Sequence, residues 1–125
     1  MFEIETIMTT DVITVARHTP ITRVLEIMSE HDVTGLPVVN DDMTLVGIIS
    51  EKDLLTLISD QGDNSAQAED FMTEDIVSFD QDEDIIAICE SLTNNHFRRV
   101  PIVSQGKLVG IVSRRDIIKY MMEPI

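Results

Sequence analysis

Two stretches of this 125-residue sequence carry the same short pattern, Ser-x-x-Asp, between an apolar run that contains a glycine and a second apolar run. The stretches are Leu45–Leu55 and Leu108–Ile118, and six of their eleven positions are identical. Each predicts a strand that runs directly into a helix, with polar side chains where the free N–H groups of the first helical turn point. Such a junction suits an anionic or hydroxyl-rich ligand. The four polar residues are Ser50, Asp53, Ser113 and Asp116.

The same residue types also form an ordinary helix cap. Serine before a helix accepts a hydrogen bond from a backbone N–H, and aspartate is favourable in the first turn. A carboxylate offers two acceptor oxygens to paired hydroxyls, while the serine hydroxyl and the N–H groups suit an anion. A single copy would favour capping, whereas the repetition favours a ligand. The two roles are compatible.

Arginines gather near the second Ser-x-x-Asp pattern. Four of the nine basic residues of the chain lie there, against 23 acidic residues overall and a net charge of −14. Because the Debye length is about 8 Å at physiological salt, a local cluster attracts a small anion even on an acidic protein. Pairing with surface carboxylates explains any single arginine, but we favour an anion site for the cluster. Its members are Arg98, Arg99, Arg114 and Arg115.

Composition excludes several classes of protein. The acidic balance argues against nucleic acid and against anionic membranes as partners, because both require a cationic surface. No apolar run approaches the roughly 18 residues of a membrane span, and the acidic start lacks the basic residues of a signal peptide. The one cysteine, Cys89, excludes an internal disulfide and agrees with a cytoplasmic location. It falls on the apolar face of a predicted helix, so we expect a core residue and not a catalytic thiol.

An internal repeat covers most of the chain. Residues 8–40 align with 72–104, and 45–55 align with 108–118, with 13 identities in 44 positions. A half of about 60 residues has a marginal core, so the two copies are expected to pack as one compact α+β module. We predict repeat boundaries at residues 1–62 and 63–125. The polar residues 59–70 are predicted to form the linker.

Each repeat predicts the order β-α-β-β-α after a short Met-Thr segment. The first strands are placed at 12–15 and 76–79. The first helices follow, with Pro20 predicted as a first helical residue. Their apolar positions, at the spacing of one helical face, are Ile21, Val24, Leu25, Met28, Ile85, Ile88, Cys89 and Leu92. The proline-containing strands at 33–39 and 97–103 predict an edge or an interruption of pairing.

This ordered series, present twice, resembles a tandem pair of CBS domains, named after cystathionine β-synthase and often called a Bateman module. The matching pieces are Met8-Thr9 with Val12–Val15, Leu36–Val39, Val46–Asp53 and their second-repeat counterparts. The resemblance covers roughly residues 3–120. It implies a regulatory module that binds adenosine compounds (AMP, ADP, ATP or S-adenosylmethionine) in clefts between the repeats and forms a homodimer. In that family the aspartate of the pattern holds the ribose hydroxyls.

The resemblance also implies two ligand pockets, each combining residues of both repeats. Arg99 stands where some family members contact phosphate, and its counterpart in the first repeat is Gly35. We therefore predict that the second pocket is the stronger phosphate binder and that the first is weak, empty or tuned to a less charged ligand. The first pocket is predicted to contain Thr34, Ser50, Lys52, Asp53, Met72 and Val77. The second is predicted to contain Met8, Ile13, Arg99, Ser113, Arg115 and Asp116.

The sequence has no motif that indicates a metal site or catalysis. His18, His31 and His96 lack metal-ligand spacing, and the acidic run Asp80–Asp84 is typical of a solvated helix start. No phosphate-binding glycine loop or nucleophile elbow is present, so we predict a non-enzyme without a metal or a required cofactor. The prediction is an adenine-nucleotide sensor acting on an unidentified effector protein. The alternatives are an S-adenosylmethionine-binding module and a ligand-free dimerisation or interaction module.

Overall fold

The computed structural model describes residues 3–59, 65–95 and 98–122. The chain divides into two compact units, called here the first unit (Ile13–Ile76) and the second unit (Met1–Val12 with Val77–Ile125). The N-terminal segment therefore belongs with the C-terminal half. The predicted boundary between repeats, at residues 62 and 63, lies outside the described residues.

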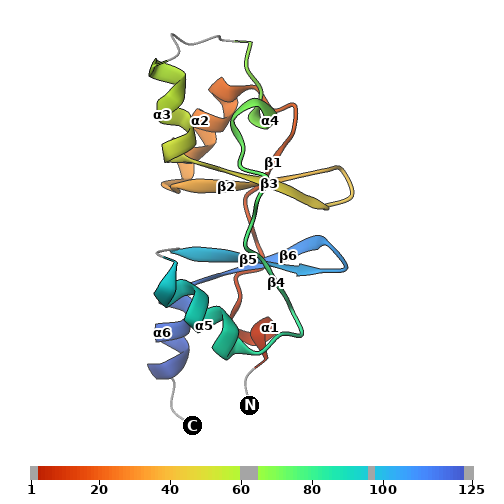
Figure 1. The fold of residues 1–125 in the computed structure, drawn as a ribbon, viewed down its shortest axis with the longest axis vertical. Helices are drawn as coiled ribbons and strands as arrows, with labels where there is room; N and C mark the ends of the chain where they lie inside the picture. Colours follow the sequence, from red (N-terminus) through yellow and green to blue (C-terminus); the bar gives the residue numbers. More distant parts are fainter. Residues whose placement is uncertain (1–2, 60–64, 96–97, 123–125) are drawn as a thin grey trace. The chain divides into compact units, whose positions relative to one another are not determined.

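The first unit holds a three-stranded sheet with helices on one face (Figure 1). β1 is parallel to β2, and β2 is antiparallel to β3. Its core contains Val24, Val38 and Ile49, which are fully buried because the apolar faces of a helix and of the sheet meet there. The elements are β1 Val15–Ala16, α2 Ile21–His31, β2 Gly35–Val39, β3 Leu45–Ser50, α3 Glu51–Ser59 and α4 Ala68–Phe71.

The second unit repeats this arrangement with the strand order β4-β5-β6. Ile4, from the N-terminal helix, is buried with Ile88 and Ile102 in its core, which explains why the start of the chain belongs to this unit. The α+β architecture and the predicted order β-α-β-β-α are confirmed. The elements are α1 Ile4–Ile7, β4 Phe79–Asp80, α5 Ile85–Asn94, β5 Arg99–Ser104, β6 Lys107–Ser113 and α6 Arg114–Met122.

Two predicted strands are shorter and later than expected. β1 and β4 have two residues each, where strands at 12–15 and 76–79 were predicted. The short β1 explains how the middle strand β2 can contain a proline. The N–H and C=O of Ile48, the register partner of Pro37 in β3, bond to Thr73 and not to β2. The backbone groups of Pro37 therefore also point away from β3. Pairing with β1 begins one residue later, at Val38, and the missing N–H of Pro37 therefore costs no ladder bond.

The first helices begin later than predicted: α2 begins one residue later, and α5 begins at Ile85, after the acidic residues 82–84 that were expected to form its first turn. Pro20 is the N-cap of α2 and not its first helical residue, and it contributes no side-chain bond. In α5, the Asp84 carboxylate accepts a hydrogen bond from the N–H of Ile86 at 3.0 Å. Leu25, predicted on the buried face of α2, is 43% exposed. The buried face of α2 is therefore narrower than expected.

The predicted linker at 59–70 is wrong over its last residues. Ala66 and Ala68 are buried in the core of the first unit, and Ala68 opens the short helix α4. The N–H of Ile21 donates to the carbonyl of Ala66 at 3.0 Å, which ties this segment to the start of α2. Small apolar side chains explain the error, because alanines among polar residues give no clear periodicity.

Candidate functional site

The first Ser-x-x-Asp pattern joins β3 to α3. Asp53 Oδ2 accepts hydrogen bonds from the N–H of Ser50 at 2.9 Å and from its hydroxyl at 3.0 Å. The Ser50 Oγ lies 3.4 Å from the N–H of Asp53, which closes the cap from the other side. Both side chains are half-buried. The predicted capping role is therefore present, and it leaves the carboxylate at the surface where a ligand can reach it.

The second pattern, at the junction of β6 and α6, has the same frame. Asp116 Oδ2 accepts from the N–H of Ser113 at 2.9 Å, and Ser113 Oγ accepts from the N–H of Asp116 at 3.1 Å. Both residues are half-buried, as in the first unit. We call the two junctions, with the residues around them, the first site and the second site.

A methionine covers the glycine of the strand at each site. A Cβ added to Gly47 would lie 2.5 Å from Met72 Sδ, and one added to Gly110 would lie 2.5 Å from Met8 Sδ. Only glycine allows this approach, since real Cβ contacts do not reach that distance. Met8 and Met72 are thus placed in the units of their predicted sites, beside β6 and β3.

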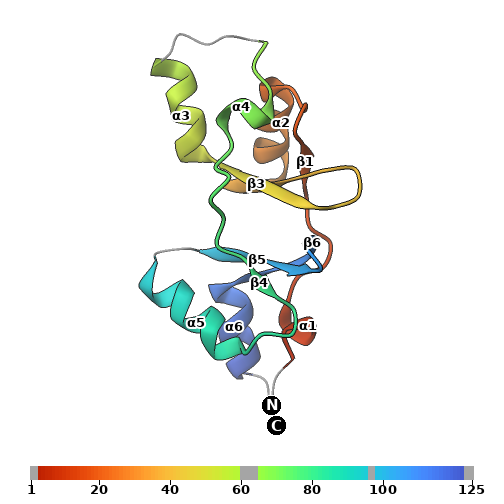
Figure 2. The same cartoon turned by 45° about the vertical axis from the view of Figure 1, so that its right-hand side comes forward.

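The residue after each methionine pairs with the same strand. Thr73 exchanges two backbone hydrogen bonds with Ile48, at 2.8 and 3.0 Å, and Thr9 does so with Ile111, at 2.8 and 2.9 Å. Figure 2 shows the segment after α4 passing beside β3. Sequence reasoning missed Thr73 as a site residue, although the hydroxyl of Thr73 donates to Asp53 Oδ1 at 3.3 Å. The repeated Met-Thr dipeptide was the available signal.

Arg99 is the register partner of Ser113 across the β5–β6 ladder, and Gly35 is the partner of Ser50 across β2–β3. Partners across an antiparallel pair project from the same face, so the exposed Arg99 side chain starts beside the second site. The first site has no side chain at that position. Thr34, one residue earlier, contributes its carbonyl, which accepts from the N–H of Glu51 at 3.0 Å.

The remaining predicted site residues fall into two groups. Lys52 and Arg115 are exposed in the first turns of α3 and α6, two residues after the serines. Ile13 and Val77 belong to the opposite compact unit from the sites for which they were predicted. Ile13 packs against the core of the first unit, and Val77 is exposed. Their roles stay predictions.

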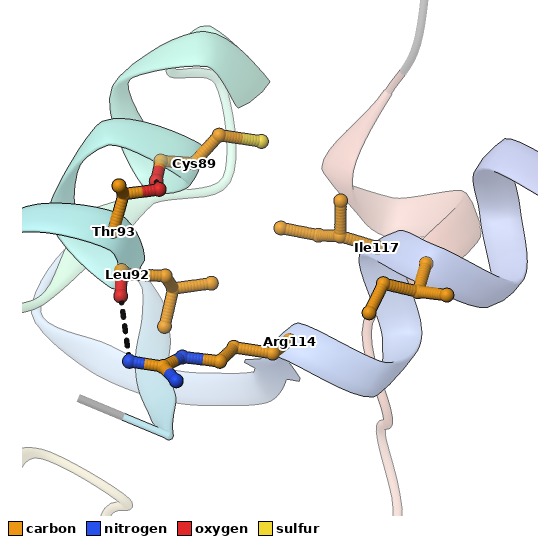
Figure 3. A pocket seen from close by; sticks show the side chains of 6 residues that line it. Cys89, Leu92, Thr93, Arg114 and Ile117 are labelled. Carbon is orange, nitrogen blue, oxygen red and sulfur yellow. Dashed lines mark hydrogen bonds between the residues drawn. The ribbon is translucent and has the colours of Figure 1, made fainter. Parts of the chain in front are cut away.

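The arginine cluster does not act as one group. A guanidinium N–H of Arg114 donates to the carbonyl of Leu92 in α5 at 3.0 Å, so this side chain turns toward the helix pair (Figure 3). Arg98 and Arg99 are exposed, and the carbonyl of Arg98 accepts from the N–H of Arg114 at 3.1 Å. Arg114 is thus bonded to α5, and Arg99 and Arg115 stay the arginines predicted for the second site.

A hollow of about 370 Å³ opens between α5 and α6 (Figure 3). Burial raises the pKa of the Cys89 thiol, and the negative charge of Asp84 raises it further. A thiol with a raised pKa is a poor nucleophile at neutral pH. Cys89 is half-buried at this hollow, however, and is not the fully buried core residue that was expected. The lining residues are Cys89, Leu92, Thr93, Arg114, Ile117 and Ile118.

The two units differ strongly in charge. The sequence of the first unit carries three basic and 13 acidic residues, whereas that of the second unit carries six basic and ten acidic residues. A phosphate therefore meets less repulsion near the second site than near the first.

The part of the chain that the structure describes has neither a metal-binding cluster nor a membrane-spanning helix. No cluster of three His, Cys, Asp or Glu side chains suitable for a metal ion occurs there. Within the same residues, no helix is long and apolar enough to cross a membrane. His96 lies outside the described residues.

The fold and the repeated junction define a class of two-repeat α+β module. The CBS domain profile matches residues 4–60 and 68–123, and the chain therefore belongs to the CBS domain family as a tandem pair. An uncharacterized protein of Methanocaldococcus jannaschii is 33% identical over 115 residues, which are 92% of this chain and 41% of that protein. Hypoxic response protein 1 of Mycobacterium tuberculosis is 31% identical over 119 residues, 94% of this chain and 83% of that protein.

Solved structures agree with this assignment. The crystal structure of CBSX2 in complex with AMP has a TM-score of 0.87 and 29% identity, covering 98% of this chain and 97% of that one. CBSX2 is a CBS-pair protein from Arabidopsis thaliana. The crystal structure of hypoxic response protein I with two coordinated zinc ions has a TM-score of 0.85 and 30% identity, covering 96% and 99%. Tandem CBS pairs are in general regulatory modules.

Proposed function

We propose that this chain is a regulatory module that binds an adenine nucleotide (AMP, ADP or ATP), with the second site as the principal phosphate-binding site. The observation that carries the proposal is the pairing of Arg99 with Ser113. It places a cation beside a half-buried junction whose aspartate keeps an acceptor oxygen for hydroxyl groups. The complex of the related CBSX2 with AMP supports the choice of ligand.

Each part of such a ligand has a matching group at the second site. Asp116 Oδ1 is proposed to accept the paired ribose hydroxyls, because the hydrogen bond from the N–H of Ser113 uses Oδ2 and no described residue donates to Oδ1. Arg99 offers planar, bidentate donation to phosphate, and the exposed Arg115 adds positive charge. Met8 contributes an adaptable apolar surface for adenine. Ile13 is proposed as a further apolar contact.

The first site is proposed as a weaker adenosine site. It contains Ser50 and Asp53 but has Gly35 where the second site has Arg99. A nucleotide there would rely on Lys52 for its phosphate, in the more acidic of the two units. The remaining proposed contacts of the first site are Thr34, Met72 and Val77.

Regulation requires that the ligand prefer one arrangement of the module over another, since equal affinity for both shifts nothing. We propose that occupancy alters a homodimer or a contact with an effector protein. The single Cys89 agrees with the cytoplasm as the place where this happens. No catalytic role is proposed.

The test is thermal unfolding of the wild type with AMP, ADP, ATP and S-adenosylmethionine. At 100-fold over Kd, a ligand that binds only the folded state adds about 2.7 kcal/mol, or several degrees. We expect a nucleotide to raise the melting temperature of the wild type. Asp116→Ala should abolish this increase, and Asp53→Ala should retain it. A response to S-adenosylmethionine alone would contradict the phosphate role of Arg99. Because both substitutions also remove a cap, the ligand-induced shift is compared and not the absolute melting temperature.

A second candidate function, a ligand-free dimerisation module, is favoured by exposed apolar side chains beside the α5–α6 hollow. Ile118 is 57% exposed and Met121 is 76% exposed, on the helix that lines the hollow. The two residues are three positions apart and so lie on one face of α6, and exposed apolar side chains that gather on one face are typical of protein interfaces. Light scattering of the wild type and of Ile118→Lys tests it. A dimer that this substitution separates, together with no response to any adenosine ligand, would favour this function over nucleotide sensing.

A further inference from the structure

The carboxylates of Asp53 and Asp116 differ in the number of hydrogen bonds that they accept from the protein itself. Asp53 accepts three hydrogen bonds, from the N–H of Ser50, the hydroxyl of Ser50 and the hydroxyl of Thr73. Asp116 accepts one, from the N–H of Ser113, among the hydrogen bonds of the described residues. A carboxylate has about four lone-pair positions, so the first site has much less capacity left for a ligand.

This difference does not come from the backbone. Thr73 and Thr9 are held at equivalent places by paired backbone bonds of 2.8–3.0 Å to Ile48 and Ile111. The two strands end in equivalent Ser-x-x-Asp caps, in which the serine Oγ accepts from the N–H of the aspartate. Among the described residues, only the Ser50 hydroxyl also donates to its aspartate. Only in the first unit does the threonine hydroxyl reach the aspartate, at Oδ1, as far as the structure describes the chain. The asymmetry is therefore a property of side-chain hydrogen bonding.

From this we infer that Thr73 is a specificity-determining residue of the first site, where its hydroxyl competes with ligand hydroxyl groups for Asp53 Oδ1. The inference rests on the proposed binding of adenosine compounds. A ribose must displace Thr73 before both of its hydroxyl groups reach Asp53, whereas Asp116 is already open. Adenosine compounds consequently fill the second site first. The first site discriminates less between a ribose and a sugar without hydroxyl groups.

The mechanism is distinct from the charge difference between the sites. Arg99 and the acidic first unit act on phosphate, whereas Thr73 acts on sugar hydroxyl groups. An uncharged nucleoside isolates the second effect because it carries no phosphate. Adenosine and 2′,3′-dideoxyadenosine differ in only the two hydroxyl groups for which Thr73 competes.

The experiment is calorimetric titration of Thr73→Val with both nucleosides, in an Asp116→Ala background that silences the second site. Valine keeps the β-branched shape of threonine, which suits the bridge to β3, and removes the hydroxyl. We expect adenosine to bind about three- to tenfold more tightly than without the substitution, the value of one displaced hydrogen bond. Dideoxyadenosine is expected to show no gain. Thr73→Ser, which keeps the hydroxyl, should retain the weaker adenosine binding.

The matched control is Thr9→Val in an Asp53→Ala background, which reports on the second site. Adenosine affinity there should not change, since Thr9 donates no side-chain hydrogen bond to Asp116 in the described structure. Weaker adenosine binding by Thr73→Val would make Thr73 a ligand donor, and an equal gain for both nucleosides would indicate a general structural effect. Either result overturns the inference.

Failure of the proposed function gives a different pattern. If no variant and no wild-type site binds adenosine or AMP, both the function and the role of Thr73 are overturned. If the second site binds adenosine and Thr73→Val leaves the first site unchanged, only the role of Thr73 is overturned. Melting temperatures of all variants, measured without ligand, establish that each is folded.

Discussion

Arg99 stands directly opposite Ser113 in the β5–β6 ladder, in the place that Gly35 occupies opposite Ser50. The register of the two ladders is equivalent, including an irregularity after Val38 in one and after Ile102 in the other. The two sites therefore differ at this position: the second site has the cation Arg99, and the first site has Gly35. The duplicated fold makes each site the internal control of the other.

Replacing Arg99 by glutamine should weaken AMP binding about 10- to 100-fold, because a hydrogen bond to a charged group contributes about 1.5–3 kcal/mol. Adenosine binding should remain within about twofold of the wild type, since the proposed contact of the ribose is with Asp116 and not with Arg99. Calorimetric titration with both ligands measures the two effects separately. An equal loss for AMP and adenosine would mean that Arg99 supports the fold of the site and does not contact phosphate.

Gly35→Arg is the complementary change and should strengthen AMP binding at the first site. A Cβ at Gly35 would meet the carbonyl oxygen of Ile49 at 3.4 Å, which is an ordinary contact, so the strand can accept the new side chain. The expected gain is several-fold, smaller than the loss from Arg99→Gln, because the first unit is more acidic. Titration in the Asp116→Ala background measures it, and an unchanged affinity would place the phosphate elsewhere.

The repeated pattern in the sequence predicted both strand-to-helix junctions, which the structure contains, while ligand binding at these junctions stays a prediction. Repetition distinguished the Ser-x-x-Asp junctions from isolated helix caps, and the alignment of the two repeats showed that Arg99 corresponds to Gly35. It did not identify Thr73, because the bond to Asp53 joins residues 20 positions apart in the chain. Contacts that depend on how two separate segments lie side by side leave no periodic trace in the sequence.

Gly47→Ala should lower the free energy of unfolding by about 1–3 kcal/mol, the usual cost of overpacking. The added Cβ would lie 2.5 Å from Met72 Sδ and 2.9 Å from its Cγ. Thermal or urea denaturation measures the change. Gly110→Ala should cost more, since its Cβ would also lie 3.0 Å from the backbone carbonyl of Thr9, which cannot move as easily as a methionine side chain.

The control for this prediction is the double variant Gly47→Ala with Met72→Ala. Removing the methionine side chain relieves the collision, so the double variant should lose less stability than the two single variants added together. Coupling of about 0.5–3 kcal/mol is typical of residues in direct contact. Additive losses would show that Met72 does not pack on Gly47 in solution.

The fold was predicted more securely than its boundaries. The apolar spacing predicted the helices α2 and α5 but not where they begin, and two-residue strands such as β1 lie below the length at which alternation is informative. The short helices α1 and α4 were missed, since four residues make barely one turn. Burial of Ala66 was missed as well, because it depends on the distant start of α2.

Asp84→Ala should destabilise the protein by about 1 kcal/mol, the usual cost of losing an N-cap side chain. Its carboxylate accepts from the N–H of Ile86 at 3.0 Å, and the substitution leaves that donor without its partner. The neighbouring Asp82→Ala is the matched control, because Asp82 is an exposed acid of the same run outside the cap. Thermal denaturation of both variants gives the comparison. An equal loss of stability in both variants would show that the removed charge, and not the lost helix cap, causes the destabilisation.

Cys89 should react slowly with thiol reagents at neutral pH. Burial raises its pKa, and the charge of Asp84 raises it further, so the reactive thiolate is scarcer than in free cysteine. The rate of reaction with a disulfide reagent should therefore increase steadily as the pH rises through and beyond the ordinary thiol range. Because the Asp84 charge contributes, Asp84→Ala should shift this profile to lower pH, although Cys89 stays on the same face of α5. Stopped-flow measurement of the reaction rate between pH 7 and 10 tests both statements. A rate that levels off at a lower pH than that of free cysteine would contradict them, because it would require an activating cation beside the sulfur.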